Sequence, residues 1–378
     1  MKKLTIITTL ALLFTIALTL QPGCSKETEE PTSESNRWLE LLRVLPANEN
    51  TLKAAHLHDF ASSMEKMEKY PEILTRYEIV YPKPFYQHGP ESRRYGYSDE
   101  ELKQTLGFVS ADVDQRSSAG TGPRDYYQAV RGRFSREDID KAVKTDPMND
   151  ILEVVSYQGH EFYSWGGDHE IHLSRRSNIR PFGIGYRLAL VDDFLFWVAW
   201  TDGIKEMIDS YEGNIKSLAD IEDYRLLSQT LEEFDVDCAF LSTESYSQSH
   251  VREVVEETSD VIGQIIEEID NVILLKPYQA LATGAGINEN GFYLIIALVN
   301  PSEAVARQNA TLLEQRINET MEFSIFYKNR LSELIESMEI ESKGRVTIAK
   351  LYGDVYWLWQ EFEITGAVGL YSPLLMHE

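Results

Sequence analysis

The fold is decided by two stretches of sequence, RLALVDDFLFWVAWTDGIKEMID (residues 187–209) and ALATGAGINENGFYLIIALVNPSEAVARQ (residues 280–308). Each stretch contains a strand, a turn, a strongly apolar strand and a helix that begins at a capping residue or a proline. The second turn contains Asn290-Gly291, and Asn-Gly between apolar runs is a strong hairpin signal. Both stretches therefore predict a β-hairpin followed by a helix, so that one unit is used twice.

The apolar strand of the first unit, FLFWVAW (residues 194–200), has no polar residue at any position. A strand that faces water on one side alternates apolar and polar residues, whereas a strand covered on both sides is apolar throughout. We therefore expect this strand to be buried on both faces of its sheet.

The order of elements predicts an α+β fold. Further strands are expected at residues 51–58, 151–157 and 236–243, with helices between them. Strand, helix, hairpin, helix, strand is the order of a split βαβ, or ferredoxin-like, sandwich. We expect two sandwich-like modules, residues 37–234 and residues 235–378, each an antiparallel sheet with helices on one face.

The net charge limits the partners of this chain. Its 378 residues include 61 Asp and Glu but only 36 Lys and Arg, which gives a formal net charge of −25. Phosphate contacts need clustered cations, so nucleic acid is not an expected partner. Apolar residues make up 43% of the chain, enough for a sizeable core, and the two cysteines exclude a disulfide framework and a multi-cysteine zinc site.

The first 24 residues are typical of an export signal. A short basic start is followed by an uncharged apolar run at residues 4–20 and then by Gly23 and Cys24. This junction resembles the signal of bacterial lipoproteins, which implies that Cys24 receives a diacylglyceryl group and that residues 1–23 are removed. An uncleaved N-terminal anchor and simple secretion are the alternatives.

Residues 24–36 predict a lipidated cysteine followed by a flexible acidic tether. The segment SKETEEPTSESN has no large apolar side chain, so it cannot bury enough surface to offset its ordering entropy. We expect the protein at the extracytoplasmic face of a cell membrane, held through its lipid because an anionic surface repels so acidic a body. The rest of the chain resembles uncharacterised exported proteins built from repeated hairpin–helix units, and that resemblance implies no activity.

Most motifs with a known chemistry are missing. The sequence contains no G-x-S-x-G, G-x-x-x-x-G-K, H-E-x-x-H or C-x-x-C motif. The leading hypothesis is therefore a non-enzymatic binding or envelope-surface module without a cofactor. Its ligand or protein partner and its oligomeric state stay open, and association through a helix at residues 251–269 is a third alternative.

The second hypothesis is a metal-dependent hydrolase with a site near residues 160–172. Three side chains in this segment could ligate a metal ion such as Zn²⁺, namely His160, Glu170 and His172. If residues 170–174 form a strand of a hairpin, side chains alternate between its faces, and only Glu170, His172 and one residue of the neighbouring strand can converge. A hairpin with exposed polar side chains is the simpler interpretation.

Aromatic and arginine side chains supply the candidate binding residues. A tyrosine-rich loop at residues 81–97 combines rings with guanidinium groups, which are typical interface anchors. A basic pair at residues 175–176 could grip a carboxylate or phosphate, and a last strand with two tryptophans could line a carbohydrate or cation site. The candidates are Tyr81, Phe85, Tyr86, Arg93, Arg94, Tyr95, Tyr97, Arg175, Arg176, Trp357 and Trp359.

Two further features have mainly structural interpretations. His56 and His58 lie near a strand end, where an ordinary exposed pair is expected and a pH-sensitive pair is the alternative. Cys238 lies in the apolar sequence VDCAFL and predicts a buried, inert thiol.

Overall fold

The computed structural model describes residues 36–74, 99–121, 125–145, 149–175, 183–244, 246–258, 272–319, 334–355, 358–359 and 373–378. Contacts within the chain separate residues 1–36 from residues 37–378, and the second of these units forms the fold. None of the helices in the described residues is both long enough and apolar enough to cross a bilayer.

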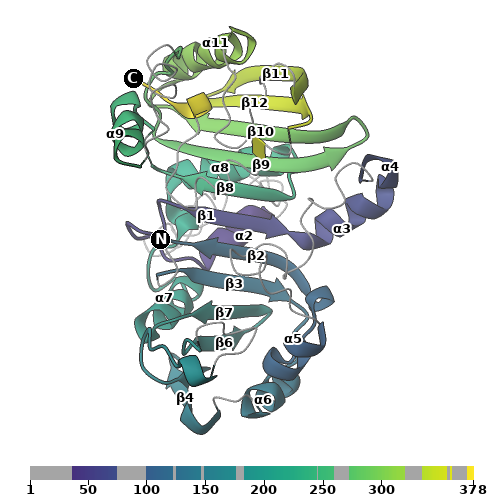
Figure 1. Ribbon diagram of the computed structural model, residues 1–378, viewed down its shortest axis with the longest axis vertical. Helices are drawn as coiled ribbons and strands as arrows, with labels where there is room; N and C mark the ends of the chain where they lie inside the picture. The colour runs from purple at the N-terminus through teal and green to yellow at the C-terminus, as the bar shows by residue number, and fades with distance from the viewer. Residues whose placement is uncertain are drawn as a thin grey trace, which may run out of the picture. The chain divides into compact units, whose positions relative to one another are not determined.

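The described strands form one twelve-stranded sheet in which every neighbouring pair is antiparallel (Figure 1). From one edge to the other the order is β11 (Ile335–Lys343), β12 (Val346–Gly353), β10 (Gly291–Val299), β9 (Ala280–Asn288), β8 (Cys238–Ser242), β1 (Ala55–Asp59), β2 (Val113–Ala119), β3 (Tyr127–Gly132), β7 (Phe194–Val198), β6 (Arg187–Val191), β5 (His160–Trp165) and β4 (Leu152–Tyr157).

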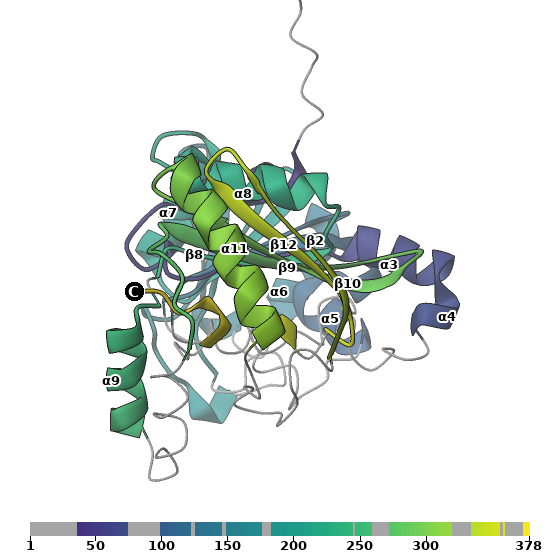
Figure 2. The ribbon, with the colours of Figure 1, turned by 90° about the horizontal axis from the view of Figure 1, so that it is seen from above.

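Helices cover both faces of this sheet (Figure 2). One face carries α2 (Arg37–Arg43), α7 (Thr201–Tyr211) and α8 (Glu222–Glu233), and the other carries α5 (Asp99–Leu106), α6 (Arg136–Thr145) and α11 (Glu303–Glu319). Between β1 and β2 the chain forms α3 (Phe60–Lys69) and α4 (Pro71–Leu74), and α9 (Gln248–Thr258) follows β8.

The pattern of side chains along the strands explains the two-sided packing. In β10, Tyr293 and Ile295 pack with the α2, α7 and α8 face, while Leu294 and Ile296 pack with the opposite face. Each buried aliphatic side chain contributes about 1.5–3 kcal/mol relative to exposure, so a strand that is apolar on both sides is stable only between two covering layers. The strand at residues 194–200 obeys the same rule, which confirms that prediction.

The α+β class is confirmed, since helices pack on a large antiparallel sheet. The expected coverage by helices on one face is wrong, because the apolar residues of the strands point to both sides. The expected modules also do not form separate sheets. Strands from residues 37–234 make one half of the sheet, strands from residues 235–378 make the other, and the β1–β8 pair joins the halves. Their division into two domains stays a prediction.

The first four strands outward from the central β1–β8 pair follow the same pattern in both directions, and β5 and β4 extend the β1 side further. These four strands are β2, β3, β7 and β6 in one half and β9, β10, β12 and β11 in the other. The counterpart of the hairpin in residues 280–308 is therefore β2–β3, and not the hairpin in residues 187–209, so the predicted repeat matches the wrong hairpins. The β2–β3 hairpin and the β6–β7 hairpin are each followed by a helix, α6 and α7 respectively, so the sequence pattern does not distinguish them.

Three local predictions differ from the structure. Residues 170–174 form only a single β-bridge, between Ile171 and Ile184, because β5 pairs with β4 and β6 instead. The sequence also favours a helix near residues 326–338, whereas the structure has β11 from Ile335 onward. The last strand pair is β11–β12, and Leu358 and Trp359 are helical rather than extended.

Candidate functional site

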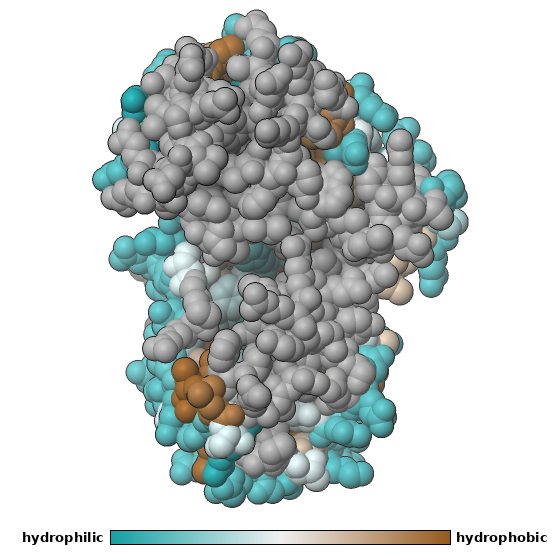
Figure 3. Space-filling model, viewed as in Figure 1, coloured by the Kyte–Doolittle hydropathy of each residue, from teal (hydrophilic) through white to brown (hydrophobic). Residues whose placement is uncertain are grey.

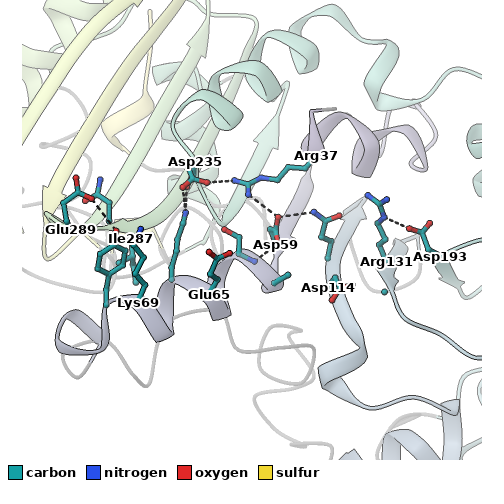
Figure 4. Close-up of a pocket in the computed structure, with 17 residues that line it drawn as sticks. Arg37, Asp59, Glu65, Lys69, Asp114, Arg131, Asp193, Asp235, Ile287 and Glu289 are labelled. Atoms are coloured by element: carbon teal, nitrogen blue, oxygen red, sulfur yellow. Dashed lines mark hydrogen bonds and ion pairs between the residues drawn. The ribbon is translucent and has the colours of Figure 1, made fainter. Parts of the chain in front are cut away.

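A polar groove of about 860 Å³ lies where β1, β3 and β9 end, beside α3 (Figure 4). Residues from both halves of the sheet line it, so it sits beside the junction made by β1 and β8. The charged lining residues are the cations Arg37, Lys66, Lys69 and Arg131 and the acids Asp59, Glu65, Asp114, Asp193, Asp235 and Glu289.

Arg37, at the start of α2, connects several parts of the groove wall. Its guanidinium lies 3.3 Å from the Asp59 carboxylate, 3.0 Å from Asp235 and 3.5 Å from Glu232. It also donates to the carbonyl of Val236 at 2.8 Å. Burial opposes the charge, but these three carboxylates raise the pKa of Arg37 above its usual value. Arg37 therefore holds α2, β1 and the turn before β8 together.

Asp59 is both the last residue of β1 and the N-cap of α3. Its carboxylate accepts from the backbone N–H of Ser62 at 2.9 Å and from the Gln115 amide at 3.1 Å. Asp59 stands directly before an amphipathic segment, a sequence pattern that predicts an N-cap, and the structure has this cap. Because the capping carboxylate also faces Arg37, the start of α3 is fixed at the floor of the groove.

Lys66, two turns further along α3, reaches across to the chain entering β8. Its ammonium lies 2.9 Å from the carboxylates of both Asp235 and Asp237. Asp237 is fully buried and also accepts from the Ser62 hydroxyl at 2.6 Å. A buried carboxylate is tolerated only where cations and donors surround it. These contacts bind α3 firmly to the second half of the sheet.

The opposite wall of the groove is built on β3. Arg131 donates to the carboxylate of Asp193 at 2.6 Å and to that of Glu40 in α2. The hydrogen bond with Asp193 is the main cause that raises the pKa of Arg131. The inner cations of the groove are thus already paired with acids of the same chain.

The rim of the groove leaves acids open to a ligand. Glu65 on α3 and Glu289 in the β9–β10 turn are exposed, and among the described residues Glu289 makes only a long hydrogen bond of 3.5 Å, from the Tyr70 hydroxyl. Lys69 lies over the ring of Tyr70, 5.1 Å from its centroid. With six acids and four cations, the lining carries an excess of negative charge. The arrangement suits a polar ligand that presents a positive charge.

Several predicted site residues lie outside the described residues. They are Cys24, Tyr81, Phe85, Tyr86, Arg93, Arg94, Tyr95, Tyr97, Arg176 and Trp357. Their roles stay predictions.

Of the three metal-ligand candidates, Glu170 and His172 contact each other, whereas His160 pairs with a different carboxylate. His160 lies 2.8 Å from the Glu212 carboxylate, while His172 lies 3.2 Å from Glu170, whose carboxylate also accepts from the Gly167 N–H at 2.7 Å. Within the described residues, no group of three or more His, Cys, Asp or Glu side chains is placed to hold a metal ion.

Arg187 orders the loop that follows β5, and the sequence gives no sign of this role. Its nearly buried guanidinium lies 2.7 Å from Asp168 and donates to the Gly166 carbonyl at 2.9 Å. Asp168 in turn accepts from Thr201 at the start of α7. The polar cluster at residues 160–172 therefore has a structural explanation.

The other described candidates are engaged within the fold. Arg175 donates both guanidinium NH₂ groups to the Asp150 carboxylate, one of them at 2.7 Å. Trp359 is 1% exposed and packs in the core of the second half. Cys238 is buried as predicted.

The two histidines of β1 are buried, which corrects the expectation of an exposed pair. His56 is 6% exposed and His58 is 3% exposed. Their strand lies in the middle of the sheet between β8 and β2, so neither side chain is at an edge. Burial disfavours the protonated form of an imidazole, so the alternative prediction of a pH-sensitive pair stays open.

No protein-family model matches the sequence, and no curated protein matches it significantly. Solved structures of TP0453 are similar over most of their length. Crystal form I is 10% identical with a TM-score of 0.38, covering 88% of this chain and 98% of that one. Crystal form III is 8% identical with a TM-score of 0.39, covering 87% and 97%.

Proposed function

We propose that this chain is a lipid-anchored, extracytoplasmic binding protein without catalytic activity, and that the polar groove beside α3 is its ligand site. The observation that carries the proposal is the groove itself, an open polar volume of about 860 Å³ with an excess of acids in its lining. Its ligand is a polar molecule or a segment of a partner protein that carries positive charge.

The chemistry of the lining favours binding over catalysis. Its inner cations are engaged with carboxylates of the same chain, as Arg37 is with Asp59 and Lys66 with Asp237. Such a wall is rigid, and rigid walls lose little entropy when a ligand binds. Large exposed apolar side chains are few among the described residues, and the described surface in Figure 3 is mainly hydrophilic, which also favours polar contacts.

A fluorescent hexalysine peptide tests the ligand site. We expect it to bind the full-length protein, purified in detergent, at low salt, and the double variant Glu65→Gln/Glu289→Gln to weaken binding about three- to tenfold. The reason is that both carboxylates lie exposed on the rim of the groove. Fluorescence anisotropy measures the dissociation constant.

A matched control separates the groove from general attraction to an acidic protein. Glu303→Gln/Glu314→Gln removes the same charge from exposed positions on α11. We expect this variant to bind nearly as well as the unmodified protein. Equal weakening in both double variants would show that the peptide responds only to net charge.

The anchor is tested at Cys24, whose acylation is implied by the resemblance to lipoprotein signals. We expect the protein to partition into the detergent-rich phase of a Triton X-114 extract, and Cys24→Ser to lose that partitioning because no thiol can be acylated. A Cys24→Ser protein that still partitions with detergent would contradict the lipid anchor.

A further inference from the structure

A strip of polar side chains crosses the sheet face that carries α5, α6 and α11. It lies where β1, β2 and β3 run side by side. It consists of the middle residues of two cross-strand rows, whose outer residues are apolar. In each row the residues are direct neighbours. The first row is Cys238, His58, Arg116, Val130 and Leu195, and the second is Phe240, His56, Ser118, Gln128 and Trp197.

The strip separates two apolar clusters of the core. Cys238 and Phe240 belong to the cluster of the second half of the sheet, and Val130 and Leu195 to a cluster of the first half. A polar strip between two apolar clusters is costly unless its groups are hydrogen-bonded.

Arg116, at the centre of the first row, is only 7% exposed. Its guanidinium makes one hydrogen bond, a long one of 3.4 Å to the Gln128 side-chain oxygen, and its Nε has no partner among the described residues. No carboxylate of the described residues pairs with it, although the chain carries an excess of acids. The other buried arginines differ: Arg187 faces Asp168, and Arg316 donates to three backbone carbonyls.

One group in the row beside Arg116 is a further donor without an acceptor in the described part of the chain. The indole N–H of Trp197, in the neighbouring row, is buried and has no acceptor among the described residues. The Ser118 hydroxyl lies 2.7 Å from the hydroxyl of Tyr126, so one of these hydroxyls donates to the other. Among the described residues, the two rows therefore contain two buried N–H donors without an acceptor and a guanidinium charge that no carboxylate pairs with.

A buried guanidinium without a counter-ion destabilises the folded state. Hydrophobic residues of similar size would fill the same space without that cost. The fold gains little from this charge, since the one hydrogen bond that Arg116 makes among the described residues is long. A role in binding explains why such a group is present, because buried and poorly compensated charges occur preferentially at functional sites.

We propose that Arg116 is the centre of a second ligand site, which takes the oxyanion group of a small organic acid, a carboxylate or a phosphate monoester. The planar guanidinium fits two oxygens of such a group at once. Phe240, whose ring centroid lies 5.1 Å from that of His56, and Val130 flank the strip with apolar surface. The acid therefore carries an apolar body beside its charged group. This site is separate from the polar groove, and it does not depend on the function proposed for that groove.

Thermal unfolding of the full-length protein in detergent tests the site with three probes, benzoate, phenyl phosphate and inorganic phosphate. We expect benzoate or phenyl phosphate to raise Tm in a saturable way. Arg116→Lys, which keeps the charge but loses the planar pair of donors, should bind the same probe about tenfold or more weakly. The control Arg133→Gln removes an exposed arginine just beyond β3 and should leave binding unchanged.

Arg116→Met separates a binding role from a structural one. If the guanidinium serves a ligand, we expect this variant to keep or raise the Tm of the ligand-free protein, by up to about 2–4 °C, and to lose the response to every probe. An equal response to inorganic phosphate supports the oxyanion site and identifies the free ion as its ligand. No response to any probe, or a full response in Arg116→Met, would overturn the proposal.

Discussion

Arg37→Met destabilises the protein by about 3 kcal/mol, because it removes the cation that three carboxylates share. Asp59 is 5% exposed and would face the groove without this partner. Methionine fills the space of the arginine stem, so the loss reflects charge and hydrogen bonds rather than a cavity. Urea unfolding at neutral pH measures the effect as a lower midpoint with an unchanged slope.

A control on the same helix isolates the ion pairs from the loss of any arginine. Arg43, in the last turn of α2, is exposed, and Arg43→Met should change stability by less than about 0.5 kcal/mol. Adding Asp59→Asn to Arg37→Met should recover part of the loss, because the unpaired charge is then removed as well. If Arg37→Met lowered the free energy of unfolding no more than Arg43→Met does, Arg37 would not hold α2, β1 and the turn before β8 together.

Acid destabilises the protein through His56, by about 2–3 kcal/mol between pH 7 and pH 4.5. Burial, with a smaller contribution from Arg116, lowers the pKa of His56 from 6.5 to about 4. Between these values the unfolded chain binds a proton that the folded chain excludes. Stability therefore rises with pH through this window, and the contribution of His56 is lost as the pH falls below about 6.5.

The variant His56→Gln should remove this part of the pH dependence. Its free energy of unfolding should fall less than that of the unmodified protein between pH 7 and pH 4.5, whereas His250→Gln, at an exposed position on α9, should follow the unmodified protein. The groups that face His56 are His58 on its own strand, Arg116 and Ser118 on β2, and Phe240 on β8. Parallel pH profiles for all three proteins would exclude His56 as the cause.

Local elements could be predicted because their signals are local. Asp59 before an amphipathic segment predicts an N-cap, and the apolar strand at residues 194–200 predicts burial on both faces. Both features are present in the structure. The order of the strands in the sheet could not be predicted in this way. It depends on pairing between distant strands such as β1 and β8, and such pairings leave no mark in a single sequence.

The candidate groove could not be predicted from the sequence for the same reason. Arg37 and Asp235 are 198 positions apart, and they meet only because β8 lies beside β1. The pattern Asp235-Val236-Asp237 before a strand was the available signal, but acids before a strand are common in so acidic a chain. Residues 160–172, by contrast, lie close together in the sequence, and the contacts of Arg187, Asp168 and Thr201 give their arrangement a structural explanation.

Hydrogen–deuterium exchange with and without the hexalysine peptide tests the central claim most directly, because it locates the bound ligand on the full-length protein. If the groove is the ligand site, the peptide slows exchange in α3 and in the β9–β10 turn, which line the groove. Exchange in α11, on the outer part of the sheet, should stay the same. Slower exchange in α11 with none in α3 would contradict the account.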